Sequence, residues 1–103
     1  MRTERIERSG YTMIYNVYEA GFTTRRVLSK YSLHEGYMVW RVEAALKMDM
    51  KTQFYYVVEV TSASAINKFL IIHPRFSAIR SVKLLNTEDA IAVLNQPTRY
   101  KLW

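Results

Sequence analysis

The segment from Gly36 to Lys51, GYMVWRVEAALKMDMK, places an apolar residue at every second position. From residue 38 onward the apolar set is Met38, Trp40, Val42, Ala44, Leu46, Met48 and Met50. The alternate set is mostly polar: Tyr37, Val39, Arg41, Glu43, Ala45, Lys47, Asp49 and Lys51. Successive side chains of a β-strand point to opposite faces of the sheet, so this pattern predicts a strand over 37–49. One face of that strand is expected to pack on a core and the other to meet solvent.

Three further segments have the composition of strands. Residues 11–19 alternate, and residues 22–33 are rich in β-branched and aromatic types. In the segment 53–60, Phe54 and its alternates form one face, while Tyr55 shares the other with Gln53 and Glu59. Short turns at 20–21, 34–36 and 49–52 predict that the four strands form an antiparallel meander.

Two segments have the residue pattern of helices. In TSASAINKFLIIHP, residues 61–74, the apolar residues recur at helical spacing, with a Thr or Ser cap at the start and Pro74 after the end. The segment 86–97, NTEDAIAVLNQP, predicts a short helix with Thr87 as its N-cap. Its inward-facing residues are expected to be Ile91 and Leu94, and Glu88 and Asp89 suit its first turn.

With a fifth strand at 79–85, these elements predict one α+β domain over residues 1–103, a length typical of single domains. The expected fold is an antiparallel four- to five-stranded meander sheet in the order ββββ-α-β-α, with the two helices packed on one face. Residues 1–10 are interpreted as a basic N-terminal arm. Residues 97–103 are interpreted as a C-terminal tail or a final edge strand.

The charge of the chain favours an anionic partner. There are 15 basic and 9 acidic residues, which gives a net charge of +6. Basic residues cluster in acid-free windows between Glu19 and Glu35 and between Glu59 and Glu88. Such windows suit nucleic acid first and membrane headgroups second. The alternative is that the excess of basic residues serves solubility alone.

The polar side of the central strands is the expected binding surface. Aromatic rings beside guanidinium groups on an open sheet can stack unpaired bases, each stack contributing about 1–3 kcal/mol. Basic neighbours can hold the phosphates. The alternative is ordinary cross-strand pairing, and Glu43 and Glu59 on the same expected face weaken the binding interpretation. The predicted nucleic-acid-binding residues are Arg25, Arg26, Tyr37, Arg41, Tyr55, Arg80 and Lys83.

No catalytic residue, metal site or cofactor is expected. The chain has no cysteine and two histidines, His34 and His73, without a matching acidic cluster. His73 is interpreted as a cation at the end of the first helix. His34 beside Glu35 could act as an acid–base pair in a small nuclease, the weakest of the hypotheses considered.

The sequence therefore predicts a noncatalytic small basic module that binds nucleic acid, with single strands favoured. The alternative is a protein–protein interaction module that inhibits or adapts a host or partner enzyme. Such a module would resemble an accessory protein of a phage or mobile element. A homodimer through a sheet edge is also expected. No apolar run approaches the roughly 20 residues of a membrane span, and the N-terminus lacks an apolar signal segment, so a cytoplasmic location is expected.

Overall fold

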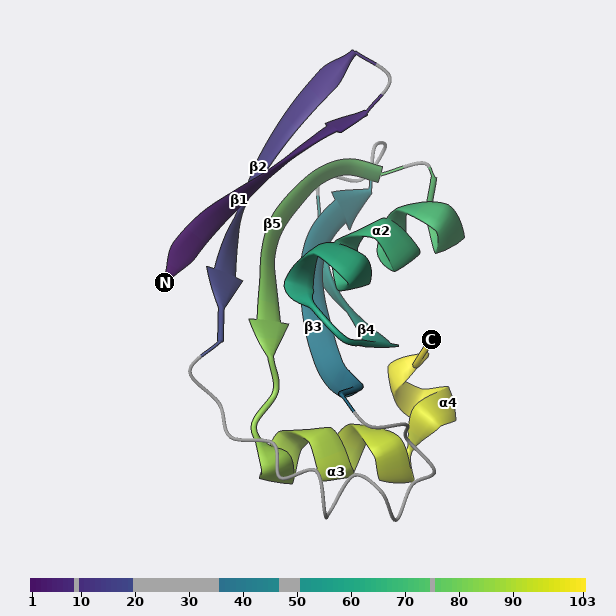
Figure 1. The fold of residues 1–103 in the computed structure, drawn as a ribbon. Helices are drawn as coiled ribbons and strands as arrows, with labels where there is room; N and C mark the ends of the chain where they lie inside the picture. The colour runs from purple at the N-terminus through teal and green to yellow at the C-terminus, as the bar shows by residue number, and fades with distance from the viewer. Residues whose placement is uncertain (9, 20–35, 47–50, 75) are drawn as a thin grey trace.

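The computed structural model describes residues 1–8, 10–19, 36–46, 51–74 and 76–103. Within these ranges a five-stranded sheet has the spatial order β1-β2-β5-β3-β4 and is accompanied by three helices (Figure 1). The elements in chain order are β1 (Arg2–Arg8), β2 (Tyr11–Tyr18), β3 (Met38–Leu46), β4 (Thr52–Glu59), α2 (Ser62–Ile72), β5 (Phe76–Leu84), α3 (Thr87–Asn95) and α4 (Pro97–Tyr100). The prediction of an α+β fold is confirmed.

The sheet is mixed, so the prediction of a purely antiparallel meander was wrong. After α2 the chain returns as β5, which lies between β2 and β3 instead of at an edge (Figure 1). In that place β5 is antiparallel to β3 and parallel to β2, with Val17 opposite Val82. The other neighbours, β1 with β2 and β3 with β4, are antiparallel. The predicted strand at 22–33 lies outside the described residues.

The main core lies between α2 and one face of the sheet. Trp40 and Val42 of β3, buried as the alternation predicts, meet Ile66, Phe69 and Leu70 of the helix. The N-cap of α2 is Thr61, whose side chain accepts a hydrogen bond from the Ser64 amide at 3.1 Å. That bond satisfies one of the amides left free at a helix start.

A second core lies on the opposite face, so the prediction that both helices share one face was also wrong. Val39, which alternates with Trp40 along β3, is buried against Leu85, Ala90 and Val93. Helix α3 therefore covers this face at one end of the sheet, with α4 beside it (Figure 1).

Two details of α3 differ from the sequence expectation. Asn86, not Thr87, is the N-cap, and its Oδ1 accepts a hydrogen bond from the Asp89 amide at 2.8 Å. The buried residues are Ala90 and Val93, each one position before the expected Ile91 and Leu94. Both sets have helical spacing, and the small Ala90 permits the close approach.

The segments interpreted as an arm and a tail contain regular structure. Within residues 1–10, strand β1 pairs with β2 along its whole length. Within residues 97–103, α4 is followed by a bridge between Leu102 and Tyr56 of β4. The Val58 amide donates to the Trp103 carbonyl at 2.7 Å, and the Trp103 amide donates to the Tyr56 carbonyl at 3.0 Å. The outer edge of β4 is thus partly covered.

Candidate functional site

The face of the sheet turned away from α2 carries aromatic and basic side chains in register. Tyr18 of β2 lies opposite Lys83 of β5, which lies opposite Arg41 of β3, which lies opposite Tyr56 of β4. Each follows a buried core residue along its strand, so the core packing turns all four to the other face. Neighbouring strands lie about 4.8 Å apart, so the row spans roughly 14 Å.

A second row lies beside the first. It consists of Asn16, Ser81, Glu43 and Phe54 on the same four strands. We call the eight residues of the two rows the open face: Asn16, Tyr18, Arg41, Glu43, Phe54, Tyr56, Ser81 and Lys83. None of the eight is fully buried, and Phe54 is 48% exposed.

Arg41 and Phe54 are the best-defined contact on the open face. They are diagonal neighbours across β3 and β4, close enough for long side chains to touch. The guanidinium carbon of Arg41 lies 4.3 Å from the centroid of the Phe54 ring. Such a cation–π contact contributes about 0.5–1 kcal/mol at an exposed site. It also holds the guanidinium in place while leaving its N–H groups able to bind an anion.

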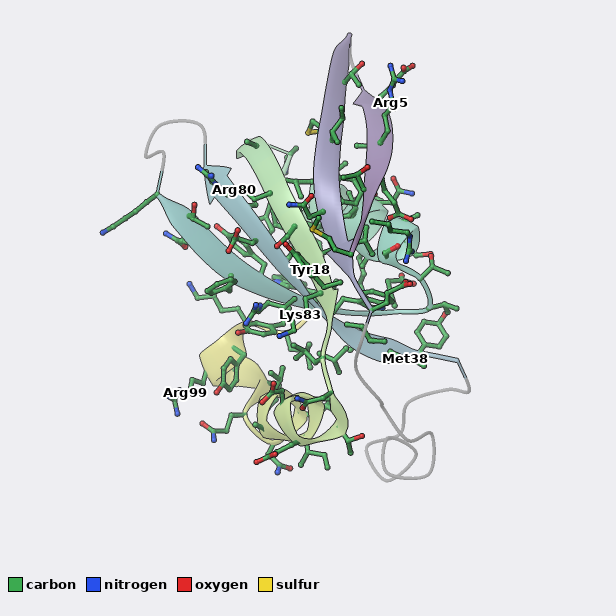
Figure 2. All side chains as sticks on the ribbon, turned by 90° about the vertical axis from the view of Figure 1, so that its left-hand side faces the viewer. Arg5, Tyr18, Met38, Arg80, Lys83 and Arg99 are labelled. Atoms are coloured by element: carbon green, nitrogen blue, oxygen red, sulfur yellow. The ribbon has the colours of Figure 1, made fainter. Side chains whose placement is uncertain are left out.

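Arg80 adjoins the open face through an irregularity in β5. Glu43 of β3 pairs with Ser81 of β5, but the next residue of β3, Ala44, pairs with Ile79. The register between the two strands therefore shifts by one residue of β5. Arg80 is the extra residue, and its side chain is exposed. Bulges of this kind re-aim side chains. In the view of Figure 2, Arg80 is labelled above Lys83, and Arg99 of α4 is labelled below it.

Helix α4 extends the aromatic surface. The rings of Tyr56 and Tyr100 meet edge to face with centroids 5.2 Å apart, and Arg99 lies 5.6 Å from the Tyr100 centroid. Burial raises the pKa of the Tyr56 phenol, although the charge of Arg41 acts in the opposite direction. Tyr56 is therefore neutral at physiological pH and can donate a hydrogen bond.

The basic side chains of this surface are not neutralised by the ion pairs of the described residues. Those ion pairs join Arg2 to Glu4 and Glu19, and Arg5 to Glu7, all on β1 or after β2. Arg41, Arg80, Lys83 and Arg99 take part in none of them. Among the eight residues of the open face, Glu43 is the one acid.

The structure brings together three of the predicted site residues, Arg41, Arg80 and Lys83. Tyr37 precedes β3 and lies four residues from Arg41, roughly 13 Å along an extended chain. Val39, between them, is covered by α3. Arg25 and Arg26 lie outside the described residues.

The placement of Tyr55 on the exposed face was wrong. Tyr55 is 8% exposed and lies in the main core, where its ring centroid is 5.1 Å from that of Phe69 and 4.8 Å from that of His73. The face of β4 was therefore inverted, and Phe54 and Tyr56 stand where Tyr55 was expected. No local signal separates the two faces, because both alternating sets of FYYVV are aromatic and aliphatic.

His73 does not act as the cation expected at the end of α2. Burial lowers its pKa, and the charge of Lys101 lowers it further, so the ring is neutral at pH 7. Its backbone amide, not its side chain, caps the helix by donating to the Phe69 carbonyl at 2.8 Å.

A separate polar cluster ties β1 to the start of α2. Ser62, which is buried, donates a hydrogen bond to Oε1 of Glu4 at 2.7 Å. The Tyr15 hydroxyl donates to the same oxygen at 3.3 Å, and Arg2 pairs with Glu4 and Glu19. Burial raises the pKa of Tyr15 to about 12, with the Glu4 charge adding to the effect. These contacts satisfy buried polar groups and anchor the edge strand.

Comparison with protein families, curated proteins and solved structures finds no match for this chain. Among the described residues, no helix has the length and apolar character to cross a membrane. The same residues contain no group of three or more acidic or histidine side chains placed to hold a metal ion. The assignment of the open face as a candidate site therefore depends on the geometry of its residues alone.

Proposed function

We propose that this protein is a noncatalytic module that binds single-stranded nucleic acid through the open face. The observation that carries the proposal is the row of Tyr18, Lys83, Arg41 and Tyr56 across four adjacent strands, with Phe54 stacked by Arg41 beside it. Two cations lie between two rings there, within reach of one strand of nucleotides.

The chemistry of the row suits unpaired bases and phosphates. Exposed rings such as Tyr18 and Phe54 offer flat apolar surfaces to bases, and Arg41 and Lys83 offer charge to the backbone. Sheet-borne aromatics stack bases in the same manner in known RNA-binding modules. The bases of a duplex are already stacked on each other, so a broad sheet face favours single strands.

A protein partner is the second candidate. Ile14 is exposed on β2 two residues before Asn16, and Phe54 and Tyr18 are also exposed on this side of the sheet. Tyr and Arg are enriched in protein interfaces, so the same surface suits a partner with an acidic rim. Salt separates the two candidates, because phosphate contacts are lost steeply with added salt and apolar contacts are not.

The test is a titration of the full chain with labelled single-stranded DNA, single-stranded RNA and duplex DNA. Affinity is measured at about 50 and 200 mM salt, a range over which several phosphate contacts lose much of their binding. The proposal predicts tighter binding of a single strand than of the duplex, with a clear loss at the higher salt. Absence of single-strand binding at low salt would overturn it and leave the protein partner.

A further inference from the structure

Strand β1 is an edge of the sheet that the described part of the chain leaves uncovered. The order of strands places β2 on one side of β1 and no described strand on the other. The opposite edge differs, because residues 102–103 bond to Tyr56 and Val58 of β4. An uncovered edge presents backbone N–H and C=O groups that can pair with a further strand. We propose that β1 pairs with β1 of a second copy of this chain, in an antiparallel homodimer with one continuous sheet.

Symmetry limits the registers that such a dimer can adopt. Antiparallel strands of two identical chains are related by a two-fold axis perpendicular to the sheet. Residues directly opposite each other lie on the same face, so odd positions meet odd positions and even positions meet even ones. The axis must therefore pass beside one residue of β1 and the same residue of the partner.

The charges of β1, RTERIER, select one of these registers. With the axis at a given residue, that residue lies opposite the same residue of the partner. An axis at Glu4, Arg5 or Glu7 therefore places two like charges opposite each other, and an axis at position 2 or 8 places two arginines opposite each other. An axis at Thr3 leaves only positions 2–4 of the two strands overlapping. An axis at Ile6 overlaps positions 4–8 and juxtaposes no like charges.

The Ile6 register pairs the exposed charges of β1 with opposite charges. Arg5 lies opposite the partner's Glu7, and Glu7 lies opposite the partner's Arg5. Arg5 and Glu7 have side chains 66% and 71% exposed and are 3.6 Å apart in the single chain. They are therefore free of the core, whereas Ile6 packs partly against it. At the axis, Ile6 and the partner's Ile6 would extend the two main cores towards each other.

Formation of the dimer does not depend on nucleic acid. The dimer does, however, affect how nucleic acid could bind. Because the axis is perpendicular to the sheet, the open faces of the two copies lie on the same side. One strand of nucleic acid could then contact both. Dimerisation is measured without ligand, so its failure and the failure of nucleic-acid binding are distinguishable.

The first test is sedimentation equilibrium of the full chain and of the two charge-reversal variants, R5E and E7R. The wild type is expected at twice the 12.2 kDa of the chain. Each variant alone sets like charges opposite each other, and its dimer dissociation constant is expected to rise at least ~10-fold. Mixing the two variants restores both ion pairs, so the equimolar mixture is expected to dimerise as the wild type does. A monomeric wild type, or a mixture no tighter than either variant alone, would overturn the proposal.

The second test fixes the register by disulfide cross-linking, in a chain that has no cysteine of its own. Opposite residues have Cα atoms about 4.5–5.5 Å apart, within reach of a disulfide. The I6C variant is therefore expected to form a covalent dimer on mild oxidation. In the matched control T3C, the two sulfurs would lie roughly 20 Å apart along the strands, and no cross-link is expected. Cross-linking of T3C in preference to I6C would contradict the register.

Discussion

Arg41 lies over the ring of Phe54, with 4.3 Å between the guanidinium carbon and the ring centroid, on the face of the sheet that α2 does not cover. This contact joins two strands and fixes a cation at the surface instead of leaving it to move freely in solvent. Lys83 and Tyr56 flank Arg41 in register. The proposed binding function rests on this arrangement.

Replacing Arg41 with alanine should weaken single-strand binding about 10-fold, the factor that corresponds to 1.4 kcal/mol. It should also reduce the slope of log affinity against log salt by about 0.7, the value for one phosphate contact on a single strand. Arg41→Lys keeps the charge but loses the planar stack on Phe54, so an intermediate affinity is expected. Lys68→Ala is the control for net charge, because it removes one positive charge from α2, together with a hydrogen bond to the Val58 carbonyl. Equal effects of Lys68→Ala and Arg41→Ala would show that net charge alone acts.

Phe69→Ala should lower the free energy of unfolding by about 3–5 kcal/mol, because it leaves a cavity in the main core. Ile71 is two residues away on the same helix and is 72% exposed, so Ile71→Ala should change stability by no more than about 0.5 kcal/mol. Urea denaturation measures both. Similar losses for the two variants would contradict the assignment of the buried face of α2.

Ser62→Ala should cost about 1–3 kcal/mol of stability, because the Glu4 carboxylate loses a hydrogen bond from a buried hydroxyl. Ser81→Ala on the open face is the control and should be nearly neutral. If hydrogen exchange of the β1 amides is unchanged in Ser62→Ala, the polar cluster does not anchor the edge strand.

The Tyr15 phenol should make stability depend on pH in the alkaline range. Its pKa is about 12 in the folded protein, against about 10 for an unperturbed tyrosine. A raised pKa means that the neutral phenol contributes stability below pH 10, and that this contribution is lost as the pH rises from 10 to 12. Stability measured across this range should therefore fall less steeply in Tyr15→Phe than in the wild type. Parallel curves would contradict the raised pKa.

Local patterns predicted much of the fold. The alternation from Met38 to Ala44 correctly identified the face of β3 that meets α2, because the opposite positions Arg41 and Glu43 are charged and cannot be buried cheaply. The helix over Ser62–Ile72 was equally clear from its cap and apolar spacing.

The failures have physical causes. In β4 both alternating sets are apolar, because one set packs under α2 and Tyr56 and Val58 of the other pack partly against the second core, so alternation could not tell Tyr55 from Tyr56. In β1, Ile6 is the single large apolar residue, so no periodicity marks the strand. The parallel pairing of Val17 with Val82 joins positions distant in the chain, and no local pattern encodes it.

The sequence predicted basic residues of the candidate site, but it did not predict its aromatic residues. The basic residues Arg41 and Lys83 of the open face, and the adjoining Arg80, could be identified from charge. The aromatic members Phe54 and Tyr18 required the register, since each has a neighbouring aromatic or aliphatic residue of similar character on the other face.

The most direct measurement compares the affinities of two matched variants for one labelled single-stranded oligonucleotide. Phe54→Ala removes the half-exposed ring that Arg41 contacts on the open face, and Ile71→Ala removes an exposed apolar side chain on the other side of the sheet. The proposal predicts that Phe54→Ala loses about 1–3 kcal/mol of binding, as expected for one base stack, while Ile71→Ala binds as the wild type does. Unchanged binding by Phe54→Ala, or equal losses in both variants, would contradict the assignment of binding to the open face.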